Sequence, residues 1–175
     1  MAILNPDHLI EQAAELIRPP PAGPPRQVDL RRAISSAYYA VFHATLAAVA
    51  DAFVGRTNRA SEQYALVYRS VSHERFKRTC GQVQGPLPPE LRNLAPSGFS
   101  TDLRRFALAG LTLQEARHTA DYDPRPRFRT SNALAQIDLA KVALRHWLNA
   151  STEQRTVFLM LLAFEPRRQR EARRR

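Results

Sequence analysis

Residues 29–55 read DLRRAISSAYYAVFHATLAAVADAFVG, and this stretch decides the fold of the chain. Apolar and small side chains recur in it at every third or fourth position, the spacing of a helix with one buried face. The positions on that face are Leu30, Ile34, Ala37, Tyr38, Val41, Thr45, Ala48 and Ala52. Gly55 follows at a point where helices commonly end in a left-handed residue. We therefore expect one long helix with an apolar stripe in the core.

The same helix carries a polar stripe beside the apolar one. At about 100° per residue, four polar side chains fall within roughly 60° of one another. They are Arg32, Ser36, Tyr39 and His43. Two interpretations fit this pattern: a partly hydrated seam between bundle helices, in which each polar group finds a partner, or one wall of a binding site.

Helical periodicity continues along the chain, and no strand pattern or internal repeat competes with it. We expect an all-α, largely up-and-down four-helix bundle with extra short N- and C-terminal helices. Its core helices are predicted near residues 29–54, 61–78, 101–121 and 132–149. Residues 81–98 read as an irregular connection with one helical turn around Pro89–Leu94.

Helix ends are marked by capping residues. Asn5 precedes a proline at the first helical position, and Ser100 and Ser131 precede later helices. Ser151 is followed three residues later by Gln154, which resembles a capping box. Local sequence thus predicts where four of the helices begin.

The length of 175 residues suits one domain with appendages and is sufficient for a hydrophobic core. The predicted division is an N-terminal helix and proline-rich connector at 1–26, the bundle at 27–150, and a short helix with a basic tail at 151–175. The single cysteine excludes an intramolecular disulfide framework. Acidic residues interrupt the first seventeen positions, and no run approaches 18 apolar residues, so we expect a cytoplasmic protein with no membrane segment.

Half of the net charge of +10 comes from the last nine residues, where six arginines accompany one glutamate. A tail of this kind is either solvated or an electrostatic contact for nucleic acid. The preceding part of the chain is only mildly basic.

A second constellation lies near the end of the helix predicted at 101–121. Arg117, His118, Asp121 and Tyr122 offer a cation, an imidazole, a carboxylate and a phenol close together along one helix. An arginine fork suits phosphate oxygens, and a histidine can move a proton at an attacked hydroxyl or a leaving oxygen, with no metal required. The alternative is structural: Arg117 and Asp121 form an ordinary i,i+4 ion pair.

Three further arginines, Arg125, Arg127 and Arg129, follow in a loop and could add phosphate contacts. The phosphate-loop, dinucleotide-fold, zinc-peptidase, nucleophile-elbow and paired-cysteine patterns do not occur in the sequence. We therefore predict no metal site and no cofactor.

The string RRAISSAYYAVFHA at 31–44 resembles the signature helix of a bacterial branch of the HEPN family, and RHTADYDP at 117–124 resembles its second signature. Residues 51–73, between the two signatures, also resemble the family, and the resemblance covers about residues 28–147. It implies a small helical protein that binds RNA or nucleotides or cleaves RNA, often the toxin-like half of a two-gene module with a minimal nucleotidyltransferase. Polar stripes beside apolar stripes are least costly to bury when they meet each other or water. We therefore expect Tyr39 and His43 to face Arg117 and Asp121 across a shared cleft, with His73 closing the third side.

The sequence departs from the family in one respect. HEPN ribonucleases use an arginine followed, after four to six residues, by a histidine, whereas Arg117 is followed at that distance by Tyr122. A phenol is a poorer base than an imidazole at neutral pH. Three functions stay open: binding of RNA or a nucleotide, metal-independent cleavage by Arg117 with His43 or His118, and a non-catalytic helical module for protein interaction.

The resemblance further implies a homodimer that pairs through the signature helices. The apolar segment Val157–Phe164 gives an independent reason, because we expect a small bundle to leave part of it exposed.

Overall fold

The computed structural model describes residues 3–18 and 23–164, and within those ranges the chain is all-helical, as predicted, with no strand. The helices are α1 (Pro6–Leu16), α2 (Gln27–Phe53), α3 (Glu62–Arg69), α4 (His73–Gln84), α5 (Thr101–Tyr122), α6 (Thr130–Asn149) and α7 (Thr152–Ala163), with short 3-10 turns η1 (Arg56–Asn58) and η2 (Pro89–Leu91). Two predicted features, the prolines at 19–21 and the arginine tail at 167–175, lie outside the described residues.

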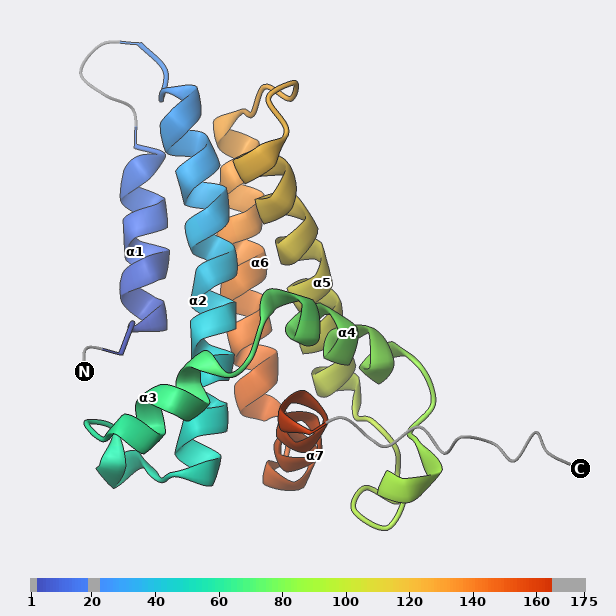
Figure 1. Ribbon diagram of the computed structural model, residues 1–175. Coiled ribbons are helices and arrows are strands. Elements are labelled where there is room, and N and C mark those ends of the chain that lie inside the picture. The colour runs from blue at the N-terminus through green and yellow to red at the C-terminus, as the bar shows by residue number, and fades with distance from the viewer. Residues whose placement is uncertain (1–2, 19–22, 165–175) are drawn as a thin grey trace, which may run out of the picture.

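The predicted long helix is α2, and it is the centre of the fold. It packs against α1, α3, α5 and α6. In Figure 1, α1, α5 and α6 run alongside α2, whereas α3 and α7 lie near the end at which α2 stops. Gly55 follows that end with a left-handed φ of 93°, as expected.

Neighbours on several sides bury more of α2 than one stripe. Ile34, Tyr38 and Val41 are almost fully buried, as the periodicity predicts, but so are Val49 and Ala50. Two predicted core positions differ: Ala48 is only half-buried and Ala52 is exposed. Which residues of α2 are buried thus depends on the helices that surround it, and not on one apolar stripe alone.

The short terminal helices contribute to the same core. Ile10 and Ala13 of α1 and Phe158 of α7 belong to one hydrophobic cluster with the buried face of α2. Phe158 packs against Phe106, with ring centroids 5.5 Å apart. The expectation that part of residues 157–164 would be left exposed holds only for the helix end: Phe164 is exposed, whereas Val157, Phe158, Leu159, Leu161 and Leu162 are buried.

The predicted helix at 61–78 is two helices, because the chain turns at Ser70–Ser72. The Ser70 hydroxyl donates to Val67 O at 2.7 Å, and the Ser72 hydroxyl accepts the Arg75 N–H at 3.1 Å as the cap of α4. His73, expected near a helix end, is therefore the first residue of α4. The following loop begins at Gly85, and it contains the expected single turn, η2.

Most helix starts follow the local capping signals. The side chains of Asn5, Ser100 and Ser151 each accept a backbone N–H of the first turn. Gln154 does not complete a capping box; its amide instead accepts from the Ser100 N–H at 2.9 Å and donates to Gly98 O at 2.7 Å, which joins α7 to the start of α5. α6 begins at Thr130, before the Ser131 expected as its cap.

By length and composition, α2 is the one helix among the described residues that could cross a membrane. Of its most apolar window, 72% is buried inside the fold. Burial of that kind is usual for the core helix of a bundle.

Gly110 allows α4 to approach α5 closely. A Cβ at this position would lie 2.9 Å from Phe76 Cζ and 3.2 Å from Cys80 Sγ, and the Phe76 ring is fully buried. Gly110→Ala should gain about 1 kcal/mol of helix propensity but lose about 1–3 kcal/mol through overpacking. We expect a net decrease in the free energy of unfolding, measured by urea denaturation.

The matched control is Gly81→Ala in α4, where a Cβ would meet no atom within 4 Å. This substitution should stabilise the protein by up to about 1 kcal/mol. Equal stabilisation by both substitutions would contradict the proposed contact between α4 and Gly110.

Candidate functional site

The side chain of Arg117 lies between α5 and α2 and is only 13% exposed. Its Nη2 donates to the Tyr39 hydroxyl at 3.0 Å. Its Nε lies 2.7 Å from Asp121 Oδ2 as an ion pair, although the N–H is not aligned for a hydrogen bond. Its Cζ lies 6.0, 5.5 and 5.4 Å from the ring centroids of Tyr38, Tyr39 and Tyr122. Burial by itself lowers the pKa of Arg117, but the Tyr39 hydrogen bond and the nearby acidic groups raise it overall.

Asp121 connects this guanidinium to a second residue of α2. The Ser35 hydroxyl donates to Asp121 Oδ1 at 2.5 Å, and Ser35 is buried. A continuous chain of polar contacts therefore runs from Ser35 through Asp121 and Arg117 to Tyr39. Both signature segments are neighbours in the fold, and the i,i+4 ion pair proposed as the structural alternative is present.

His73 lies at the start of α4, against the same cluster. Its Nδ1 is 2.7 Å from the Tyr38 hydroxyl, and its backbone carbonyl accepts from Gln114 Nε2 at 3.0 Å. Burial lowers the pKa of His73, and the Arg117 charge lowers it further, whereas Asp121 opposes that shift. The imidazole is therefore neutral at pH 7 and can accept a proton.

His43 lies one turn beyond Tyr39 on α2. Its Nδ1 is 2.8 Å from the Tyr68 hydroxyl, and its ring centroid is 5.9 Å from that of Tyr39. Burial lowers the pKa of His43, and the charge of His73 lowers it further. His43 thus belongs to the cluster but reaches Arg117 only through Tyr39.

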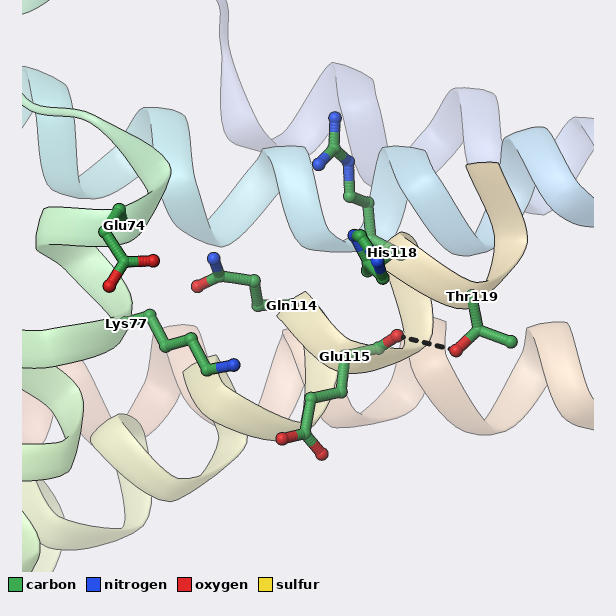
Figure 2. Close-up of a pocket in the computed structure, with 7 residues that line it drawn as sticks. Glu74, Lys77, Gln114, Glu115, His118 and Thr119 are labelled. Carbon is green, nitrogen blue, oxygen red and sulfur yellow. Dashed lines mark hydrogen bonds between the residues drawn. The ribbon is translucent and has the colours of Figure 1, made fainter. Parts of the chain in front are cut away.

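A groove of about 500 Å³ opens between α4 and α5 next to this cluster. Its lining residues are Glu74, Lys77, Gln114, Glu115, Arg117, His118 and Thr119. Figure 2 shows Glu74 and Lys77 of α4 facing Gln114 and Glu115 of α5. His118 is exposed, and its ring lies 5.1 Å from that of Tyr122, which is 65% exposed. We call this feature the α4–α5 groove.

The groove contains an unsatisfied acceptor. Gln114 Oε1 is buried and has no hydrogen-bond partner, while the Nε2 of the same amide is fixed on His73 O. A donor from a ligand or a water molecule in the groove would satisfy this oxygen. Among the described residues, no group of three or more histidine, cysteine, aspartate or glutamate side chains is arranged to bind a metal ion.

The three predicted loop arginines differ in whether another side chain pairs with them. Arg125 forms a bidentate contact with Asp123, at 2.9 Å for both hydrogen bonds, although its side chain is 87% exposed. Hydrogen bonds from Arg125 hold the pKa of Asp123 at about 2. Arg127 and Arg129 are exposed, and Arg129 is the first residue before α6. The loop therefore presents one neutralised and two available cations.

Arg31 of α2 holds the same loop in place. Its Nη1 donates to Ala120 O and Asp123 O, both at 2.8 Å, and its Nη2 donates to Pro126 O at 2.7 Å. Its guanidinium also lies over the Phe128 ring, 5.1 Å from the centroid. A single charged side chain thus satisfies carbonyls at the end of α5 and fixes the path toward α6.

Two predicted binding residues lie elsewhere. Ser36 points toward α1, where its hydroxyl is 3.4 Å from Gln12 Oε1, and Arg32 is exposed with no contact to the cluster among the described residues. The polar stripe of α2 is therefore divided: Tyr39 and His43 face the cluster, and Ser36 faces another helix. The stripe as a whole is not one wall of a site.

Four residues of the site were not predicted as functional from the sequence: Ser35, Tyr38, Tyr68 and Lys77. Tyr38 was predicted only as a core residue, and Ser35 had no predicted role, because spacing alone does not show that they form hydrogen bonds to α4 and α5. Lys77 could have been found, since it lies at i+4 from His73 and such residues share a helix face.

No family model, curated protein or solved structure matches this chain. The HEPN resemblance of residues 31–44 and 117–124 therefore stays a hypothesis that depends on those two segments.

The two cluster histidines predict a pH dependence of stability. Their pKa values lie below 6.5 in the folded protein, so below pH 6.5 the unfolded chain binds more protons than the native state. The stability they contribute is present above pH 6.5 and is lost as the pH falls through the lowered pKa values. We expect the free energy of unfolding, measured by urea titrations at about pH 7.5 to 5, to decrease toward acid.

In the double variant His43→Gln and His73→Gln this decrease should be smaller. Paired carboxylates such as Asp123 titrate at much lower pH and do not contribute in this range. Identical slopes in the wild type and the double variant would show that these histidines are not held neutral by the fold.

Proposed function

We propose that this chain is a HEPN-like helical protein that binds RNA or a nucleotide-bearing ligand through phosphate contacts at the α4–α5 groove. The observation that carries the proposal is the position of Arg117: its guanidinium is fixed by Tyr39 and Asp121, and it lines a groove that also contains Lys77 and His118. Glu74 and Glu115 also line the groove, but the fixed cation of Arg117 and the flexible cation of Lys77 are suited to phosphate oxygens.

Each of these three side chains has a different chemical role. Tyr39 and Asp121 engage Nη2 and Nε of Arg117, and within the described residues no hydrogen bond uses Nη1, which is left for a ligand oxygen. Lys77 is an exposed point charge on a flexible stem. His118 is exposed and can donate to or accept from a phosphate or a ribose hydroxyl.

An aromatic face next to the groove favours a nucleotide over simple phosphate. Tyr122 is 65% exposed, although it borders Arg117 and His118. A base can stack on such a ring without sequence preference, typically with about 1–3 kcal/mol per base. The exposed Arg127 and Arg129 extend the basic surface along the following loop.

Metal-independent RNA cleavage is the second candidate, and the neutral histidines favour it. His43 and His73 are both suited to accept protons, yet the Nδ1 of each is engaged by a tyrosine hydroxyl, and neither lines the groove. A ligand in the groove meets His118 directly, so cleavage would depend on Arg117 with His118. Binding requires only contacts in the groove, whereas cleavage also requires a histidine at the reacting atoms. Binding is therefore our first choice.

The proposal includes the organisation that the resemblance implies. Residues 27–150 would form a HEPN-like bundle with added terminal segments, and a minimal nucleotidyltransferase encoded beside it would be the protein partner of a toxin-like module. A purely structural interaction module is the competing function. It would leave the groove without a ligand.

RNA binding tests the proposal directly. Fluorescence anisotropy with a labelled single-stranded RNA in EDTA should show binding that weakens as salt increases. Lys77→Ala combined with His118→Ala should raise the dissociation constant by about tenfold and reduce the salt slope, because phosphate contacts are lost. The control Arg92→Ala with Arg105→Ala removes two exposed cations away from the groove and should change it less than about twofold.

A variant lacking residues 165–175 separates the basic tail from the groove. If binding disappears with the tail but is unchanged in the groove variant, the proposed site is wrong. The same incubations, analysed on a denaturing gel, test cleavage: fragments formed by the wild type and not by His118→Ala would establish the ribonuclease. If no form of the protein binds RNA at low salt, both nucleic-acid functions would be wrong, and the interaction module would be the function that still fits.

A further inference from the structure

The α4–α5 groove changes along its length in the kind of polar group that it presents. Figure 2 shows Gln114 of α5 on the side of the groove near Glu74 of α4, with Glu115 next to it. Both glutamates are exposed and form no ion pair with another described residue. Arg117 and His118, proposed above to contact phosphate, lie about one turn farther along α5. We call the part lined by Glu74, Gln114 and Glu115 the acceptor end.

The amide of Gln114 is held in one orientation at the acceptor end. Its Nε2 donates to the His73 carbonyl oxygen at 3.0 Å, and its Oε1 is buried and has no hydrogen-bond partner among the described residues. An unpaired buried acceptor costs free energy, so a ligand that donates to Oε1 gains more than one that does not. Glu74 and Lys77 on the opposite helix are exposed, and their side chains can move to admit such a ligand.

A phosphate group does not fit the acceptor end. The oxygens of a phosphodiester carry no proton at neutral pH, so they cannot donate to Gln114 Oε1, and the carboxylates of Glu74 and Glu115 repel them. In a nucleotide, the edge of the base lies farthest from the phosphates and carries N–H donors. Adenine, cytosine and guanine each have an exocyclic amino group, which uracil lacks.

We propose that Gln114 is the specificity-determining residue of the α4–α5 groove and selects bases with an exocyclic amino group over uracil. The proposal rests on the proposed function, because a phosphate at Arg117 is what brings a base to the acceptor end. The amino group of cytosine donates to Gln114 Oε1. Uracil has a carbonyl oxygen in that place, and its N3–H lies between two carbonyl oxygens that the nearby carboxylates repel.

The length of the groove allows two bases to be contacted by different residues. Gln114 and Tyr122 are eight positions apart, which is about 12 Å along the helix, and Arg117 lies between them. A phosphate at Arg117 would thus join a nucleotide at Tyr122 to one at the acceptor end. Stacking on Tyr122 is tolerant of sequence, so the preference for one base over another depends on Gln114.

Oligomers of cytidine and uridine test this selection, because the two pyrimidines are of equal size and differ at the base edge. Labelled oligomers of about eight nucleotides suit a single-strand site of this kind. Fluorescence anisotropy in EDTA, at low salt and neutral pH, should show that the wild type binds oligocytidine about tenfold more tightly than oligouridine. Gln114→Met is similar in size but has no acceptor oxygen, and it should reduce this ratio to below about twofold.

The ratio of the two dissociation constants does not depend on the folded fraction, so partial unfolding of Gln114→Met cannot imitate the loss of selection. Gln114→Glu retains an acceptor oxygen, and it should still favour oligocytidine although its charge weakens the binding of both oligomers. Tyr122→Ala should weaken the binding of both oligomers equally and leave their ratio unchanged, since the ring stacks on either base.

Equal binding of the two oligomers by the wild type would overturn the proposal, and so would a ratio that Gln114→Met leaves unchanged. In both cases the proposed binding of RNA would still stand. The ribose 2′-hydroxyl is the other donor in RNA. If Gln114→Met removed a preference for oligocytidine over oligodeoxycytidine but kept the preference over oligouridine, Gln114 would contact the ribose and the proposal would be wrong. A wild type that binds neither oligomer would overturn the proposed function together with this inference.

Discussion

The structure depends on how one buried guanidinium is satisfied. Arg117 is almost enclosed between α5 and α2, and a charge at that depth must be paired and hydrogen-bonded if the fold is to tolerate it. Asp121 supplies the opposite charge from the next turn, and Tyr39 supplies an acceptor from the other helix. Ser35, in turn, fixes Asp121. These four residues set how α2 and α5 lie against each other.

The same enclosure determines what the nearby histidines can do. A nearby cation disfavours a second positive charge, so the pKa of His73 is lowered by burial and then by Arg117, whereas the pKa of His43 is lowered mainly by burial. Both rings are fixed by tyrosine hydroxyls. Chemistry that needs a mobile, accessible imidazole is therefore more readily supplied by His118, which lies at the α4–α5 groove.

Arg31 fixes the surface next to this cluster. Arg31 fixes the loop that carries Arg127 and Arg129, so the basic segment after α5 has a defined path from the cluster.

Features that depend on residues close in sequence were predictable from the sequence. The long helix, the left-handed Gly55, the caps at Asn5 and Ser100, and the Arg117–Asp121 pair all involve contacts within a few positions, so spacing and residue type determine them. The division of residues 61–78 was also encoded locally, by Ser70 and Ser72, but helical periodicity across that turn obscured it.

Only the tertiary structure decided which neighbour covers each face of α2. Adjacent faces of a helix differ by a single residue step of about 100°, and periodicity does not identify the helix that packs on each face. For that reason Tyr39 meets Arg117 while Ser36 meets α1, and Gln154 binds the start of α5 instead of its own helix. The α4–α5 groove likewise requires two separate helices to lie side by side. The sequence by itself determined the helices and their local ion pair; long-range packing determined the site.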